Sequence, residues 1–201
     1  MATAAAGNVV FLVGFMGAGK TSVGRALGQR LNWIFEDLDD RIEQRERRSV
    51  AEIFRDSGEG AFRAAEHAAL KQVLDDLGGD PGGDLSEGSP RVIALGGGAF
   101  AQPANAALLK ATGVPTVFLD APADELWERC CKQASEAGPE RPLLKNREQF
   151  QRLYDERRRH YAKAQVKANT SGRTVEAMAA EIEKKLTLKK IVIQTESGEV
   201  E

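Results

Sequence analysis

The sequence has few cysteines, no long hydrophobic run and no excess of charge of either sign. Its two cysteines, Cys130 and Cys131, are neighbours without a second pair or histidines at metal-binding spacing. This excludes a disulfide framework and a zinc site, and it favours reduced thiols in the cytoplasm. No apolar run approaches the roughly 20 residues that cross a bilayer, and the segment Met1 to Gly7 is too short and uncharged for a signal peptide. We therefore expect a cytoplasmic protein with no membrane partner.

The net charge and the length of the chain limit the possible partners and the number of domains. With 28 basic and 30 acidic residues the net charge is −2, which argues against a nucleic-acid partner. A chain of 201 residues with 42% hydrophobic content can bury one sizeable core, so we expect one domain over residues 1–188 and a monomer. The tail 189–201 contains Ile191-Val192-Ile193, and it either adds an edge strand or stays disordered.

Short apolar runs alternate with longer helical patterns, which predicts an α/β fold with a parallel sheet of about five strands between helical layers. The strands are expected at Val9 to Val13, Phe35 to Asp39, Arg91 to Gly96, Thr116 to Asp120 and Val166 to Thr170. The first run is apolar without alternation, as in a strand covered on both faces. Glycine and proline dominate residues 77–90, which we expect to form a flexible loop within the domain.

A glycine-rich loop follows the first predicted strand. Gly14-Phe-Met-Gly17-Ala-Gly19-Lys20-Thr21 matches the pattern G-x-x-x-x-G-K-[ST] of a phosphate-binding loop, the P-loop, and the helical pattern Ser22 to Leu31 follows it. Its backbone N–H groups and the helix N-terminus attract phosphates, Lys20 reaches the outer phosphates, and the Thr21 hydroxyl binds Mg²⁺. The motif therefore predicts ATP and Mg²⁺ as cofactors. The expected contacts are Gly17, Ala18, Gly19, Lys20, Thr21 and Ser22.

Two carboxylates, Asp37 and Asp39, stand two residues apart at the end of the second predicted strand. Period two would place both on one face, where one supports the Mg²⁺ shell or the attacking hydroxyl and the other binds a polar substrate. The alternative is a capping cluster for the next helix. Asp40 is the better candidate for that cap, which leaves Asp37 and Asp39 for chemistry.

Two further segments carry candidate substrate contacts. Arg63 and Glu66 share one helix face as i,i+3 partners, either as a surface ion pair or as part of a site. Gly96-Gly97-Gly98 ends the third apolar run, and three glycines permit a close backbone approach to a ligand, whereas a plain turn needs fewer. We favour a substrate-facing loop.

Residues 132–145 are expected to form a mobile lid. Gly138, Pro139 and Pro142 interrupt the helical pattern around Arg141, which could neutralise charge on a transferring phosphoryl group. The alternative is a solvated loop. Further on, the run Arg157-Arg158-Arg159 lies on a helix whose residues point about 100° apart, so at most one or two of these arginines face one anion.

The ordered set of these segments resembles shikimate kinase over about Val9 to Leu186. Its members are the P-loop, Asp37-x-Asp39, Gly58-Glu59-x-x-Phe62-Arg63-x-x-Glu66, Gly96-Gly97-Gly98, Arg141-Pro142-Leu143-Leu144 and Glu156-Arg157 before Tyr161. The resemblance implies a P-loop kinase-like fold. It also implies transfer of the ATP γ-phosphate to the 3-hydroxyl of shikimate, a step towards chorismate and the aromatic amino acids.

The resemblance also implies roles for single residues. Asp39 would bind substrate hydroxyls, Arg63 and Arg157 would grip the shikimate carboxylate, and Gly97 and Gly98 would contact the substrate through their backbone. Lys20, Asp37 and Arg141 would be catalytic, with Asp37 supporting the metal-water shell or accepting the hydroxyl proton and Arg141 near the transferred phosphate. Arg129 is a further candidate for stacking on adenine.

The sequence departs from the family at Asn32 and Arg47, where glycine is usual. Asn tolerates the left-handed backbone conformation, whereas Arg47 would be strained in it. Two alternative functions stay open at this point. One is a kinase for another hydroxylated acid such as gluconate, and the other is a nucleotide-dependent switch or binding module.

Overall fold

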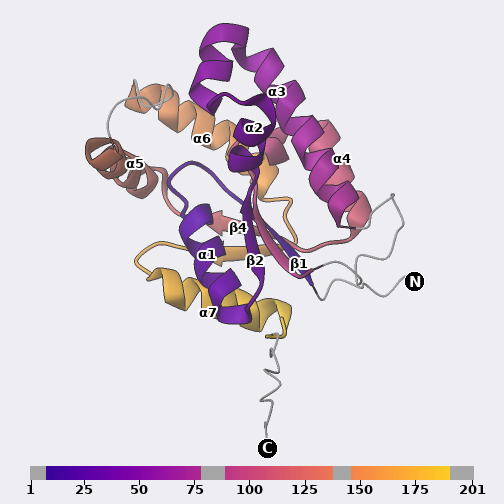
Figure 1. The fold of residues 1–201 in the computed structure, drawn as a ribbon. Coiled ribbons are helices and arrows are strands. Elements are labelled where there is room, and N and C mark those ends of the chain that lie inside the picture. The colour runs from indigo at the N-terminus through magenta and orange to yellow at the C-terminus, as the bar shows by residue number, and fades with distance from the viewer. Residues whose placement is uncertain (1–7, 78–88, 138–145, 191–201) are drawn as a thin grey trace, which may run out of the picture.

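A computed structural model describes residues 8–77, 89–137 and 146–190. The strands are β1 (Val9–Val13), β2 (Ile34–Asp37), β3 (Arg91–Ala94), β4 (Thr116–Asp120) and β5 (Val166–Asn169). The helices are α1 (Lys20–Leu31), α2 (Leu38–Glu46), α3 (Val50–Asp76), α4 (Pro103–Thr112), α5 (Ala123–Ala137), α6 (Arg147–Tyr161) and α7 (Val175–Leu186), with the short 3₁₀ helix η1 at Ala99–Ala101. Figure 1 traces them along the chain.

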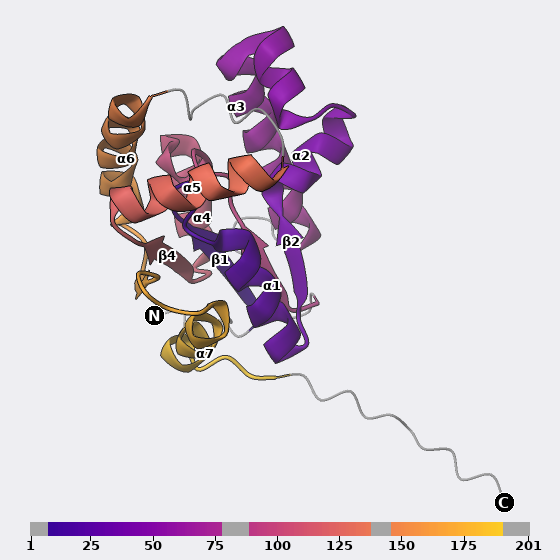
Figure 2. The same ribbon diagram turned by 90° about the vertical axis from the view of Figure 1, so that its left-hand side faces the viewer.

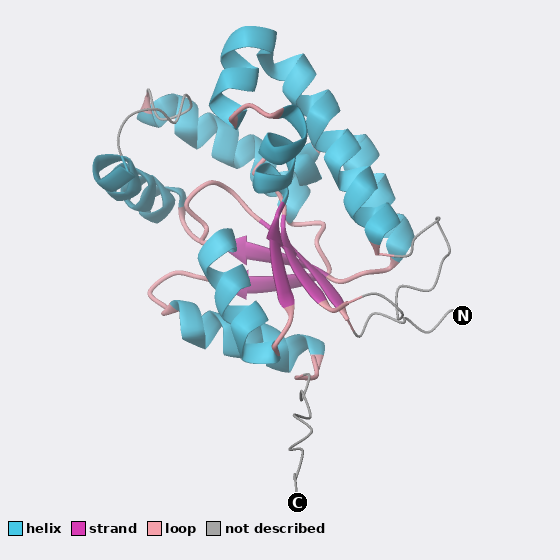
Figure 3. Cartoon of the chain, viewed as in Figure 1, coloured by secondary structure: helices cyan, strands magenta, loops and turns pink. Residues whose placement is uncertain are grey.

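The five strands form one parallel sheet in the order β2-β3-β1-β4-β5, which confirms the predicted sheet (Figure 3). β1 lies in the middle, where Phe11 pairs with Ile93 on one side and Thr116 on the other. All five residues of β1 are buried, as its unbroken apolar run predicts. Parallel strands end at the same edge, so the P-loop after β1 and the glycine loop after β3 are neighbours.

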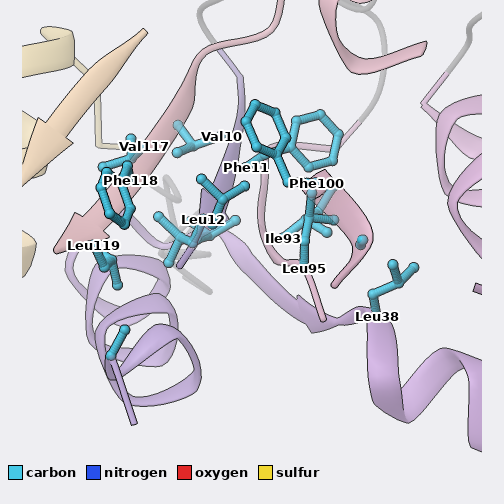
Figure 4. Close-up of a cluster of buried hydrophobic side chains, with 14 of the residues drawn as sticks. Val10, Phe11, Leu12, Leu38, Ile93, Leu95, Phe100, Val117, Phe118 and Leu119 are labelled. Carbon is cyan, nitrogen blue, oxygen red and sulfur yellow. The ribbon is translucent and has the colours of Figure 1, made fainter. Parts of the chain in front are cut away.

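Helices cover both faces of the sheet. α1 and α7 pack together on one face, whereas α3, α4 and α6 lie on the other, as the two perpendicular views in Figures 1 and 2 show. Apolar side chains of the central strands fill the interior between these layers, among them Phe11, Leu12, Ile93 and Phe118 (Figure 4). None of the described helices is both long enough and apolar enough to cross a bilayer.

The second strand and the helix after it differ from the prediction. β2 ends at Asp37, and Asp39 lies in the first turn of α2, so the expectation that both carboxylates sit on one strand face is wrong. Asp37, not Asp40, is the N-cap, because its carboxylate accepts a hydrogen bond from the Asp39 N–H at 3.2 Å. The hydrogen bond from the Asp39 N–H to the Asp37 carboxylate starts a helix at Leu38, so the strand does not continue to Asp39 as the alternating pattern predicted.

Other predicted segments fall partly or wholly outside the described residues. α5 continues to Ala137, so the first part of the expected lid at 132–145 is helical, while 138–145 are not described. The expected loop at 77–90 is described only at Leu77, Ser89 and Pro90, and the tail 189–201 only at its first two residues. The predicted single domain over 1–188 stays a prediction.

The two residues that stand where glycine was expected, Asn32 and Arg47, both adopt the left-handed backbone conformation. Arg47, the C-cap of α2, has φ 53°, and Asn32, the C-cap of α1, has φ 60°. A left-handed conformation costs an ordinary L-residue about 1–2 kcal/mol, whereas asparagine adopts it with less strain. Arg47 therefore holds strain that a glycine would release.

We predict that Arg47→Gly stabilises the protein by about 0.5–1 kcal/mol, since relief of strain exceeds the entropy that glycine loses on folding. Urea denaturation would measure this as a higher midpoint at unchanged slope. The matched variant Asn32→Gly should change stability by less. A loss of stability in Arg47→Gly, or equal gains in both variants, would contradict the role of strain at Arg47.

Candidate active site

The P-loop forms the first half of the site. It runs from the end of β1 to Lys20, the first residue of α1, and Gly14, Gly17 and Gly19 all have positive φ. A Cβ at Gly17 would lie 2.8 Å from the Cys130 Sγ, so glycine is needed there for close packing as well as for the turn. The N-cap Gly19 has no side chain to cap α1, which leaves the first turn of the helix suited to an anion.

Lys20 and Thr21, the first two residues of α1, both make hydrogen bonds through their side chains. The Lys20 ammonium donates to the carbonyl oxygens of Gly14 and Phe15 at 3.0 and 3.1 Å, and so folds back over the loop. The Thr21 hydroxyl donates to the Asp37 carboxylate at 2.9 Å. The end of β2 thus reaches the start of α1 through one hydrogen bond, and this brings a hydroxyl and a carboxylate oxygen together.

This oxygen pair fits Mg²⁺. The ion prefers one or two protein oxygens, with phosphates and water in its remaining positions. Within 8–77, 89–137 and 146–190 no cluster of three histidine, cysteine or acidic side chains forms a metal site. A Mg²⁺ ion here would therefore be held jointly with the nucleotide phosphates, which is the arrangement expected beside a P-loop.

The second half of the site surrounds the glycine loop after β3. Arg63 on α3 donates to Glu66 at 2.9 Å, which confirms the predicted i,i+3 pair, and Glu66 is fully buried. A Cβ at Gly98 would lie 2.6 Å from the Arg63 Cζ, and a Cβ at Gly96 would lie 3.0 Å from the Glu66 Oε1. The pair therefore lies beside the glycine loop. Because Glu66 is fully buried, the alternative of a surface ion pair is wrong for this residue.

Asp39 joins the same cluster from α2. Its Oδ1 would lie 2.7 Å from a Cβ at Gly96, and both this atom and the Glu66 Oε1 are buried without a hydrogen-bond partner in the structure. Burial raises the pKa of Asp39 to about 6, with a contribution from Asp37, and Lys20 partly opposes the shift. Burial also raises the pKa of Glu66, against the opposing effect of Arg63. Two acceptor oxygens thus stand ready for donors from a ligand.

α6 brings Arg157 to the other side of the glycine loop. The Arg157 Nη1 would lie 3.6 Å from a Cβ at Gly97, and its guanidinium lies 6.0 Å from the ring centre of Phe15 in the P-loop. Of the three consecutive arginines, Arg158 instead binds Asp120 at 2.8 Å and Arg159 is exposed. Only Arg157 reaches the glycine loop, in agreement with the expected spread of directions.

Sequence reasoning missed the contacts that orient α6, two of which lie beside the site. The Tyr161 hydroxyl donates to the Gly97 carbonyl oxygen, and Arg158 holds α6 to Asp120 at the carboxyl end of β4. The periodicity of α6 signals which side chains share a face. Periodicity does not show that Tyr161 binds a carbonyl of the glycine loop or that Arg158 binds a carboxylate of β4, so these contacts are seen only in the folded structure.

Arg129 on α5 lies beside the P-loop. It donates to the Gly17 carbonyl oxygen at 3.4 Å and to the Thr170 carbonyl oxygen at 2.9 Å, and it pairs with Glu125. The structure therefore brings Arg129 to both the P-loop and the segment after β5. Arg141 lies outside the described residues, so its place in the site stays a prediction.

Comparison with known proteins identifies the family. The family model for shikimate kinase matches residues 16–187. The chain belongs to the shikimate kinase family. A shikimate kinase of Persephonella marina is 34% identical over 86% of this chain and 95% of the relative, and one of Cereibacter sphaeroides is 37% identical over 94% and 87%. The solved shikimate kinase from Acinetobacter baumannii, in complex with shikimate, has a TM-score of 0.75 at 29% identity and covers 90% of this chain and 93% of its own.

Membership of the shikimate kinase family settles the class of reaction. The chain is an ATP-dependent phosphotransferase that uses Mg²⁺, as its P-loop motif predicts. The switch or binding module that the sequence left open is thereby replaced by an enzyme. The P-loop follows β1 and the glycine loop with its carboxylate-arginine cluster follows β3, so both lie at the same edge of the sheet.

We predict that Asp39→Asn stabilises the free protein at neutral pH, because Asn carries no buried charge. The native state holds the Asp39 proton up to about pH 6, whereas the unfolded chain releases it near pH 3.8, so stability falls as pH rises through this window. The advantage of Asp39→Asn should therefore shrink by about 2 kcal/mol between about pH 7.5 and pH 4.5.

Urea denaturation at both pH values would measure this difference, with Asp75→Asn as the control for an exposed carboxyl. A constant difference between Asp39→Asn and the unchanged protein across the two pH values would show that Asp39 is not the titrating group.

Proposed function

We propose that the chain transfers the γ-phosphate of ATP to the 3-hydroxyl of shikimate and forms shikimate 3-phosphate, in the cytoplasm and as a monomer. One observation supports this acceptor above all. Two guanidinium groups, Arg63 and Arg157, flank Gly97 and Gly98 beside the buried acceptor oxygen of Asp39. A ring acid with several hydroxyls offers one carboxylate for the arginines and donors for the aspartate. Partnership with nucleic acid or membrane is not part of the proposal, since the net charge is −2.

The arginine pair binds the acceptor carboxylate in this proposal. Planar guanidinium groups match a carboxylate with two parallel hydrogen bonds, and partial burial strengthens such bonds. Arg63 is held in place by Glu66 at 2.9 Å, and Arg157 by the packing of α6 against the glycine loop. Gly97 and Gly98 keep this space open, because a side chain at Gly98 would overlap the Arg63 guanidinium.

Asp39 and Asp37 divide the work on the hydroxyl groups. Asp39 accepts hydrogen bonds from ring hydroxyls through the oxygen that lacks a partner in the free protein. Substrate donors favour its charged form, so acceptor binding should lower the pKa that burial has raised. Asp37, beside Thr21, supports the metal-water shell and accepts the proton of the attacking hydroxyl.

The phosphate end uses the P-loop. The backbone from Gly17 to Ser22 would hold the phosphates, Lys20, which donates to the Gly14 and Phe15 carbonyl oxygens in the free protein, would bind the outer phosphates, and Thr21 would be a ligand of Mg²⁺. The metal ion supplies charge neutralisation at the transferred group. Arg129, which contacts Gly17 and Thr170, would stack on the adenine, and Arg141, which lies outside the described residues, would neutralise charge on the transferred phosphate. Phosphoryl transfer depends on such positioning and charge stabilisation more than on covalent chemistry.

The acceptor is tested by ADP release from ATP and Mg²⁺ with shikimate, with quinate, with gluconate and without acceptor. Shikimate should accelerate ADP release at least a hundredfold over the rate without acceptor, because water is excluded and the hydroxyl is positioned only in its presence. Stronger stimulation by gluconate would replace the acceptor with another hydroxylated acid. Equal rates with every addition would contradict the proposal.

Gly98→Ala should separate acceptor binding from nucleotide binding. The backbone at Gly98 is unstrained, with φ −107°, so the added methyl group acts only by displacing the end of the Arg63 side chain. We predict a rise in KM for shikimate of about tenfold or more, with KM for ATP changed less than twofold, since loss of a charge-assisted hydrogen bond costs about 1.5–3 kcal/mol.

Gly60→Ala on α3 is the matched control, because a Cβ there has no neighbour within 4 Å. Thermal unfolding should show both variants to be folded. Equal effects of Gly98→Ala on both KM values would mean that the Arg63 side chain does not belong to the acceptor site.

A further inference from the structure

β2 is an edge strand whose outer side is open in the described part of the protein. It pairs with β3 alone, from Ile34 opposite Arg91 to Asp37 opposite Ala94. Ile34 is 51% exposed and is the only large hydrophobic side chain exposed to this degree among the described residues. Open edges with apolar side chains invite pairing with another strand, and proteins usually cover or protect them.

The backbone of β2 shows which groups face the open side. The Ile34 N–H donates to the Pro90 carbonyl oxygen at 3.0 Å, so it points towards β3. Successive N–H groups of a strand point to opposite sides, which directs the Phe35 N–H away from β3 and the Glu36 N–H towards it. Hydrogen exchange at the Phe35 amide therefore measures protection on the open side of β2, and exchange at the Glu36 amide measures protection on the side paired with β3.

A groove of about 450 Å³ runs along this edge. Ile34, Phe35 and the residues after them form one wall, while Arg25 of α1 and Gln44 of α2 contribute at its sides. The Arg25 guanidinium lies 5.8 Å from the ring centre of Phe35. Ile34 and Phe35 are the apolar part of a lining that is otherwise charged or polar, and they lie on the strand whose outward-facing backbone groups suit an extended segment of chain.

The end of the described chain arrives next to this groove. Leu188, after α7, is buried, and its N–H donates to the Glu183 carbonyl oxygen at 3.0 Å. The Trp33 indole N–H then donates to the Lys189 carbonyl oxygen at 3.2 Å. Trp33 directly precedes β2, so this hydrogen bond places Lys189 near the amino end of the edge strand.

The sequence that follows has the composition of a strand. Ile191-Val192-Ile193 is a run of β-branched apolar residues that begins two positions after Lys189. A strand advances about 3.3 Å per residue, so a segment that leaves Lys189 towards the carboxyl end of β2 brings these residues beside Ile34 to Glu36. Ile34 and Phe35 point to opposite faces of the sheet, and an all-apolar partner can contact both.

We propose that Ile191 to Ile193 add to the sheet as a sixth strand, parallel to β2 on its outer edge. The attachment at Lys189 makes this pairing intramolecular, so it forms at a high effective concentration and competes with pairing to a second copy of the chain. The added strand covers Ile34 and ties the end of the chain to the strand that carries Asp37.

Hydrogen exchange of the Phe35 amide, followed by NMR, tests this proposal. The full chain is compared with a chain that ends at Lys190. We expect exchange at Phe35 to be at least tenfold faster in the shortened chain, because its N–H loses a hydrogen-bond partner, while exchange at Glu36 stays within twofold. Equal exchange at Phe35 in the two chains, whether fast or slow, would overturn the proposal.

Two point variants guard against a general effect of shortening the chain. Ile193→Asp adds a carboxylate within the proposed strand and should accelerate exchange at Phe35, whereas Ser197→Asp adds one beyond it and should not. Acceleration by both or by neither would count against the proposal. Protection that persists in the shortened chain and grows with protein concentration would assign the edge to a second copy instead.

Discussion

The Arg63–Glu66 ion pair is the interaction on which the arrangement of side chains around the glycine loop depends. Glu66 is fully buried, and a buried carboxylate that loses its partner destabilises a protein by about 3–5 kcal/mol. The 2.9 Å contact therefore fixes the Arg63 guanidinium above the glycine loop. Only glycine at position 98 leaves room for it, so the requirement for a small residue there follows from a charge buried on another element.

The glycine loop is also the point at which separate layers of the fold meet. Gly97 accepts a hydrogen bond from Tyr161 of α6, and Gly96 lies against Asp39 of α2. The hydrogen bond between Thr21 and Asp37 links the same end of the sheet to the start of α1. The P-loop and the glycine loop thus lie at one edge because the carboxyl ends of parallel strands meet at the same edge of the sheet.

Much of this arrangement was predictable from local sequence, and the misses have identifiable physical causes. The β1 run and the P-loop carry strong local signals, so the strand, the turn and the helix start agree with expectation. Asp39 was placed on a strand because alternation fits short segments well, whereas cap chemistry at Asp37 begins the helix earlier. The contact between Arg158 and Asp120 joins residues 38 positions apart, and no local pattern contains it.

The central claim is that Arg63 recognises the carboxylate of the acceptor. The most direct test compares kcat/KM for shikimate and for its carboxamide, in the unchanged enzyme and in Arg63→Ala. The enzyme should prefer the carboxylate by about a hundredfold or more, and Arg63→Ala should reduce this preference at least tenfold, because one of two guanidinium partners is lost. An unchanged preference in Arg63→Ala, even with a lower overall rate, would contradict the account.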